Sequence, residues 1–127
     1  MTTGTLSGDT TITTTNVLGG ALFINGSQTV PAGTTLTLDA GVVVKMAVAT
    51  GWTVNGTFNA VGGGAPVVIT TLTDDSIGGD TNNDGANSSP NPGDWTSVLL
   101  NDTADASNLE NLQLRYGGRF SQSALRL

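Results

Sequence analysis

The sequence contains no cysteine and no histidine, and its basic residues are few. Without cysteine the chain can form neither disulfide bonds nor a thiolate metal site, so packing and backbone pairing must hold the fold. Without histidine a Ser-His-Asp nucleophile arrangement is excluded. Four Lys and Arg stand against ten Asp and Glu, which gives a net charge of -6. This sign excludes nucleic acid and anionic membranes as natural partners, and it favours cations as ligands.

Long apolar runs are also missing. No stretch approaches the roughly 20 apolar residues of a membrane span, so we expect no membrane insertion. The first residues, Met1 to Gly4, lack the basic and apolar regions of a signal peptide. We therefore expect that any secretion signal has been removed and that Met1 is an expression start.

The residues that are abundant are typical of strands and turns. The chain has 127 residues, 18 of them glycine, and a charged fraction of 11%. That length suits one domain, and no window places apolar residues at helical spacing for more than about one turn. Thr and Val, which favour strands, are frequent. The pattern predicts short strands at Thr11 to Thr15, Ala21 to Asn25, Thr34 to Asp39, Val42 to Met46, Trp52 to Asn55, Val67 to Leu72, Trp95 to Leu100 and Leu109 to Tyr116.

One short motif occurs twice. Ile24-Asn25-Gly26 recurs as Val54-Asn55-Gly56, an offset of 30 residues. A unit repeated at 20 to 50 residues indicates a solenoid, because each coil buries its apolar side against the next. With this offset as one coil, Leu38 falls on Val68. Asn25 and Asn55 are then expected to stack about 4.8 Å apart.

Three segments together carry a family resemblance. They are the run from Val30 to Lys45, the run from Val54 to Thr71, and the Gly, Asp and Asn pattern from Gly78 through Trp95 to Gly118. Over residues 20 to 127 they resemble the right-handed parallel β-helix repeat proteins of bacterial surfaces and secretions. The resemblance implies an all-β, right-handed parallel β-helix (β-solenoid) of the pectate-lyase type and an extracellular or cell-surface location. Fold alone does not carry function.

Local patterns support strands and turns without the resemblance. Pro31-Ala32-Gly33 predicts a turn, because proline presets its φ and glycine accepts a positive one. Leu36 and Leu38 alternate with polar residues and are expected to face inward. Val42 to Val44 is continuously apolar, as in a strand covered on both sides.

We expect a single β-helix domain over residues 1–127. Within it, residues 1–20 form an N-terminal cap or edge region, and residues 73–94 form a long Asp, Asn and Gly loop. The chain stops at Ala124 to Leu127, a pattern typical of the middle of a strand. We expect the N-terminal portion of a longer protein, or a module that pairs end to end.

The long loop contains part of a calcium motif. Asp80, Asn82, Asp84 and Gly85 match the first half of a D-x-[DN]-x-[DN]-G loop, with the carbonyl of Ala86 as the next ligand. The twelfth place, where a complete loop has Glu, is Asn91. Asp94, or else Asp74 or Asp75, is expected to supply the missing carboxylate. The alternative is that these residues form only Asx turns in a solvated loop.

We expect no enzymatic activity from this chain. A polysaccharide lyase of this fold would need a basic residue beside calcium, for which Lys45 and Arg115 are the candidates, although a solvent-facing strand position is the commoner role. Trp52 and Trp95 each open a strand, where a ring can stack on a sugar or cover the core. We favour the core for Trp95.

The sequence therefore predicts a structural or adhesive module, calcium-stabilised and able to associate with itself through open solenoid ends. The alternative is a carbohydrate-binding or polysaccharide-degrading β-helix, with extracellular carbohydrate as partner, whose active coils lie outside this segment.

Overall fold

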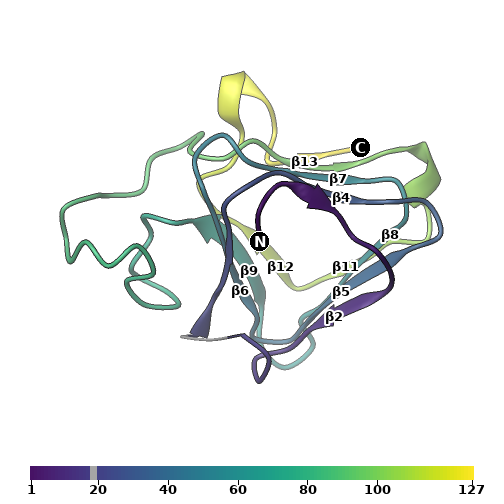
Figure 1. Ribbon diagram of the computed structural model, residues 1–127, viewed down its shortest axis with the longest axis horizontal. Helices are drawn as coiled ribbons and strands as arrows, with labels where there is room; N and C mark the ends of the chain where they lie inside the picture. Colours follow the sequence, from purple (N-terminus) through teal and green to yellow (C-terminus); the bar gives the residue numbers. More distant parts are fainter. Residues whose placement is uncertain (18–19) are drawn as a thin grey trace.

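The computed structural model describes residues 1–17 and 20–127, and these form a parallel β-solenoid of about five turns with almost no helix. Figure 1 looks down the solenoid, whose cross-section is a triangle. The chain turns clockwise as it recedes from the viewer, which is a right-handed winding, as parallel crossover connections favour. The expected all-β, right-handed parallel fold is confirmed.

Three parallel sheets form the sides of the triangle, and each full turn adds one strand to each. Sheet A contains β1 (Gly4–Thr5), β4 (Gln28–Val30), β7 (Trp52–Val54), β10 (Val98–Leu100) and β13 (Leu125–Arg126). Sheet B contains β2 (Thr10–Ile12), β5 (Thr35–Asp39), β8 (Thr57–Val61) and β11 (Asn108–Glu110). Sheet C contains β3 (Leu22–Ile24), β6 (Val43–Met46), β9 (Val67–Thr71) and β12 (Leu112–Leu114). Two short 3-10 helices, η2 (Asp102–Ala104) and η3 (Arg119–Ser121), lie in the later turns.

The coil is shorter than the predicted 30 residues. Val30 pairs with Val54, 24 positions on, and Leu38 pairs with Ala60 rather than with Val68. The expected stacking of Asn25 on Asn55 is also wrong, because Asn25 follows β3 in sheet C and Asn55 follows β7 in sheet A. The repeated motif marks the end of a strand at two different corners of the triangle.

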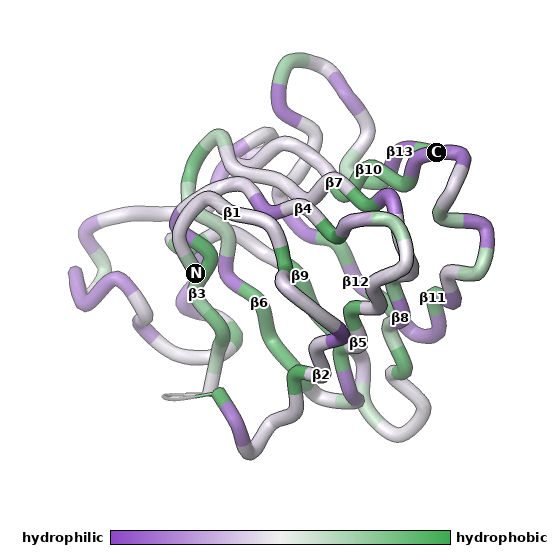
Figure 2. Tube along the Cα trace, turned by 45° about the vertical axis from the view of Figure 1, so that its right-hand side comes forward, coloured by the Kyte–Doolittle hydropathy of each residue, from purple (hydrophilic) through white to green (hydrophobic). Residues whose placement is uncertain are grey.

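The core fills the inside of the triangle. Leu36 and Leu38 face inward, each 1% exposed, as expected, and Leu36 stacks on Phe58 of the next turn. Trp52 and Trp95 are 2% and 0% exposed and belong to the same core. Figure 2 shows the strands carrying most of the apolar residues.

The two central strands of sheet C, β6 and β9, are buried on both faces. Every residue of β6 and β9 is buried, which confirms the interpretation of Val42 to Val44 as covered on both sides. A second, smaller apolar cluster lies on the outer face, formed by Ala21, Val43 and Val68 with Ile77 packed against them. Ile77 comes from the long loop, so this loop covers the outer face of sheet C at Val43 and Val68.

The long loop connects β9 to β10 without a strand or helix of its own. We call residues 72–97, between Thr71 and Val98, the insert. It projects beside sheet C on the left of Figure 1. After it, Val98 pairs with Trp52, so the solenoid resumes in register on the preceding turn.

The first turn of the solenoid has edges that the chain itself caps. The side chain of Asn16 accepts a hydrogen bond from the Thr13 amide at 2.8 Å and donates one to the Thr11 carbonyl at 3.1 Å. The Met1 carbonyl accepts from the Asn25 amide at 2.8 Å, next to β3. At the other end, β11 and β12 are the last strands of their sheets.

Candidate functional site

The insert is closed at its base and tied to the solenoid at both ends. The hydroxyl of Thr73 donates to the Asp94 carboxylate at 3.3 Å, across the neck of the loop. The amides of Leu72 and Thr96 donate to the carbonyls of Met46 and Thr50 at 2.9 and 2.8 Å. The loop between them is therefore held against one place on the solenoid.

Three carboxylates converge within the insert. Asp75, Asp80 and Asp84 each offer an oxygen, and these oxygens lie within 4.8 Å of one another. Asp75 comes from the start of the insert, whereas Asp80 and Asp84 belong to the predicted calcium motif. Three like charges this close oppose folding unless cations neutralise them.

The motif itself forms a tight turn. The Asp80 carboxylate accepts hydrogen bonds from the amides of Asp84 at 3.1 Å and Gly85 at 2.8 Å. Gly85 has a φ of 70°, which the turn requires and which glycine adopts without strain. These Asx-type bonds are the ones expected of a solvated loop, so they do not by themselves distinguish a turn from an ion site.

Side-chain oxygens without partners do bear on that distinction. One oxygen each of Asp75, Asn82 and Asp84 (Oδ1) is buried and has no hydrogen-bond partner among the residues that the structure describes. Buried polar atoms are nearly always satisfied, by protein, water or an ion. The donors are all oxygen, which suits Ca²⁺ or Mg²⁺ better than Zn²⁺. The residues present therefore fit a hard divalent cation.

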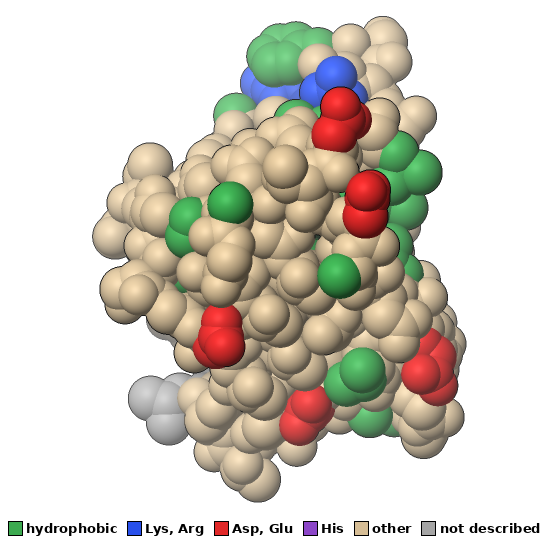
Figure 3. Space-filling view, turned by 90° about the vertical axis from the view of Figure 1, so that its right-hand side faces the viewer, with side chains coloured by type: hydrophobic (Ala, Val, Ile, Leu, Met, Phe, Trp, Pro, Cys, Tyr) green, Lys and Arg blue, Asp and Glu red, His purple; other side chains and the backbone are tan. Residues whose placement is uncertain are grey.

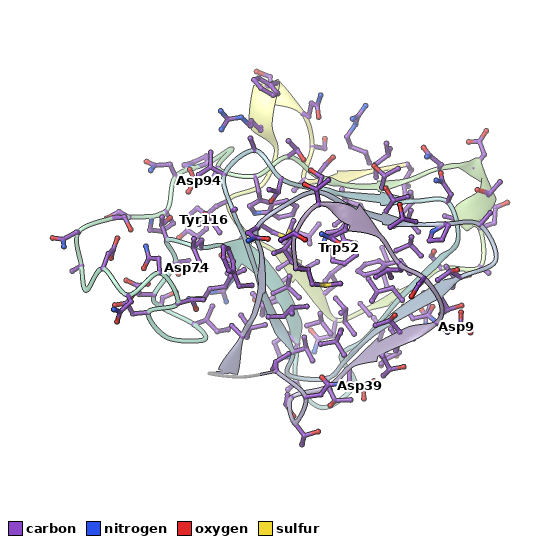
Figure 4. The ribbon with its side chains drawn as sticks, in the orientation of Figure 1. Asp9, Asp39, Trp52, Asp74, Asp94 and Tyr116 are labelled. Carbon is purple, nitrogen blue, oxygen red and sulfur yellow. The ribbon has the colours of Figure 1, made fainter. Side chains whose placement is uncertain are left out.

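The other predicted ligands have different positions. The Asp94 carboxylate accepts from the Asn91 amide at 3.0 Å, as well as from Thr73, at the neck of the insert. Figure 4 shows Asp94 near Tyr116, whose carbonyl accepts from the Asp94 amide at 3.0 Å. Asp75 joins Asp80 and Asp84 instead. A role for the Ala86 carbonyl stays a prediction.

Asp74 is bound to the sheet. Its carboxylate accepts from the Thr70 hydroxyl at 2.7 Å and from the Ser76 amide at 3.2 Å, and Arg115 lies 3.9 Å away. Burial raises the pKa of Asp74, but the hydrogen bonds from Ser76 and Thr70 and the charge of Arg115 outweigh burial and lower it below its ordinary value. Asp74 therefore anchors the insert as an ionised group.

Lys45 is the residue whose environment the sequence did not indicate. It is 0% exposed because the insert covers the outer face of β6, so the expected solvent-facing position is wrong. Its Nζ donates to the carbonyls of Asp74, at 2.8 Å, and of Gly79. Burial lowers the pKa of Lys45, although Asp75, Asp74 and Asp80 oppose that effect. The only sequence feature that could have indicated this burial is a strand lysine in a chain that also contains a long acidic loop.

The two tryptophans do not present their rings to solvent. Trp95 donates its Nε1 hydrogen to the Arg115 carbonyl at 2.7 Å, which confirms the core interpretation of this residue. Trp52 points into the triangle (Figure 4). Neither indole is available for stacking on a sugar.

Comparison of the chain with protein-family models, with curated proteins and with solved structures gave no match. Within residues 1–17 and 20–127, no helix has the length and apolar character needed to cross a membrane.

Proposed function

We propose that this chain is a structural module, a rigid β-solenoid segment of a bacterial surface or secreted protein, in which calcium binds the insert and stabilises the fold. The resemblance to right-handed parallel β-helix proteins of the pectate-lyase type is part of this proposal. The module acts by cohesion rather than by catalysis.

The convergence of Asp75, Asp80 and Asp84 within 4.8 Å carries the proposal. The unpartnered oxygens of Asp75, Asn82 and Asp84 support it, because an ion would satisfy them. Extracellular calcium modules bind with Kd values of about 10⁻⁴–10⁻³ M. A site of three carboxylates on a loop suits that range and an environment rich in calcium.

The outward faces support a scaffold role. Thr5, Thr29 and Thr53 pair in one column along sheet A. Thr11, Thr37 and Asn59 pair in one column along sheet B. Seen from the right-hand side of Figure 1, the carboxylates are separated from one another, mostly by uncharged side chains, and the uppermost one lies beside a basic side chain (Figure 3). A repetitive, hydroxyl-rich face suits adhesion through many weak contacts.

Thermal unfolding in calcium and in chelator tests the stabilisation. At a calcium concentration ten times Kd, binding adds about 1.4 kcal/mol, which raises Tm by roughly 3–6 °C for a domain of this size. Asp84→Asn removes the shift, whereas Asp105→Asn, in an exposed part of the fourth turn, keeps it. An identical Tm in millimolar calcium and in chelator would remove calcium from the proposal.

Self-association through the solenoid ends is tested by sedimentation velocity over a range of protein concentrations. The sheet edges at β11 and β12 predict larger species at higher concentration. A monomer throughout the range removes this part of the proposal.

A second candidate is carbohydrate binding, favoured by a groove of about 170 Å³ on sheet A. Its lining includes the hydroxyl residues Ser27 and Thr96, with Gln122 and Arg126. Hydroxyls and a guanidinium suit a polyhydroxylated ligand. Titration calorimetry with oligosaccharides tests it: binding that Arg126→Ala weakens supports this function, and the absence of heat with every sugar excludes it for this segment.

A further inference from the structure

Lys45 is a buried cation that the insert covers from above. It lies on the outward face of sheet C, in β6, where it pairs with Phe23 on one side and Thr70 on the other. The insert crosses its side chain at Gly78, where an added Cβ would lie 3.3 Å from the Lys45 Cε. The insert and the lysine stem are therefore in direct contact.

The ammonium group binds the main chain of the insert at two points. Lys45 Nζ donates to the carbonyls of Asp74 and Gly79. These residues immediately precede Asp75 and Asp80, two of the three convergent carboxylates. One side chain of the solenoid thus fixes the backbone beside two cluster members that come from different parts of the insert.

The charges around the carboxylate cluster would be balanced by one divalent ion. Asp75, Asp80 and Asp84 carry three negative charges, and Lys45 supplies one positive charge. Asp74 has its own partner in Arg115, 3.9 Å away. The remaining two negative charges equal the charge of a single divalent cation.

We propose that Lys45 is the positioning residue of the carboxylate cluster: its ammonium holds the insert to sheet C and brings Asp75 beside Asp80 before any metal ion binds. The part that concerns the ion rests on the function proposed above. In this arrangement the metal-free insert stays closed over Val43 and Val68. A divalent ion then further stabilises an insert that is already closed.

Amide hydrogen exchange of the metal-free protein, in chelator, tests the proposal. We expect Lys45→Met to speed exchange of the amides of residues 74–84 by roughly tenfold to a hundredfold, because hydrogen bonds from a charged donor are lost. The amides of β5, in sheet B, are expected to exchange as in the wild type. Arg126→Met is the control, since it removes one positive charge from an exposed position on sheet A.

Lys45→Gln removes the charge but keeps an amide donor. If Lys45→Met fails to fold, Lys45→Gln tests the role of Lys45 in its place. Faster exchange confined to residues 74–84 in Lys45→Gln supports the proposal. Unchanged exchange in that segment overturns it. Loss of protection throughout the solenoid in both variants also overturns it, because Lys45 would then support the fold as a whole.

Measurements with calcium distinguish a failure of this proposal from a failure of the proposed function. If calcium fails to alter the wild-type Tm, the proposed function fails, while the metal-free exchange comparison still decides the role of Lys45. If calcium does bind, we expect it to restore most of the protection of residues 74–84 in Lys45→Met.

Discussion

The side-chain amide of Asn101 donates a 2.7 Å hydrogen bond to the side-chain oxygen of Asn55, although the whole insert lies between them in the sequence. Thr103 adds a bond from its hydroxyl to the Asn55 carbonyl at 2.6 Å. The coil that follows the insert therefore packs against the coil that precedes it, at the same corner of the triangle. The insert is an addition to the solenoid, and the stack of coils continues past it.

Phe58 tests the stacked core. It is 0% exposed and pairs with Leu36 of the turn below. We expect Phe58→Ala to lower the free energy of unfolding by about 3–5 kcal/mol, since it leaves a cavity. The neighbouring outward residue gives the control: Thr57→Ala should change it by less than about 1 kcal/mol. Urea unfolding at equilibrium measures both, and equal costs would contradict the assignment of faces.

Gly117 tests the packing around Trp95. An added Cβ would lie 2.7 Å from the indole ring and 2.9 Å from the Ala124 Cβ. We expect Gly117→Ala to cost about 1–3 kcal/mol through overpacking. A Cβ added at Gly64 would have no atom within 4 Å, so Gly64→Ala is the matched control. A Tm unchanged by the Gly117 substitution would show that Trp95 does not occupy this position.

Two adjacent glycines test the contact between the insert and sheet C. Gly78 and Gly79 have φ values of 71° and 77°, so an alanine is strained equally at either. Only at Gly78 would the new Cβ meet other residues, at 3.0 Å from Ala21 and 3.1 Å from Val43. We expect Gly78→Ala to destabilise the protein by about 1–3 kcal/mol more than Gly79→Ala. Differential scanning calorimetry of the pair measures the difference, and its absence would place the insert away from the sheet.

Asp74 gives the fold an acid sensitivity. Its folded pKa is lowered, so its ionised form stabilises the fold above the ordinary value of 3.8. That stabilisation is lost as the pH falls from 3.8 through the lower folded pKa. At pH 7, Asp74→Asn should cost about 1.5–3 kcal/mol. We expect the gap between wild type and variant, measured by urea unfolding, to shrink below pH 3.8, whereas a constant gap down to the acid limit would show that the charge of Asp74 does not contribute.

The fold could be predicted from sequence because its signals are local. Three sequence patterns each describe one strand or one corner: the alternation at Leu36 and Leu38, the continuous apolar run from Val42, and the turn at Pro31. Strands β4 and β8 were missed: Gln28–Val30 has only three residues, and Thr57–Val61 carries only Phe58 as a large apolar residue at its inward positions, with the small Ala60 at the other. The register was wrong because the Asn-Gly motif indicates the end of a strand and not the corner at which that strand ends.

The candidate site could be predicted only within one segment. Asp80, Asn82 and Asp84 are close in sequence, and their spacing marks the motif. Asp75 joins them through the path of the insert, and Lys45 lies on a strand, 35 positions before Asp80. Which carboxylate meets the motif depends on where the insert folds back on the sheet, and no short-range pattern encodes that.

The most direct test is a two-dimensional amide NMR spectrum of the protein titrated with calcium. We predict saturable shifts confined to residues 74–88 of the insert, with the amides of β5 and β8 unmoved. Shifts that are absent at millimolar calcium, or that appear only at carboxylates elsewhere on the surface, would contradict a cation site formed by Asp75, Asp80 and Asp84.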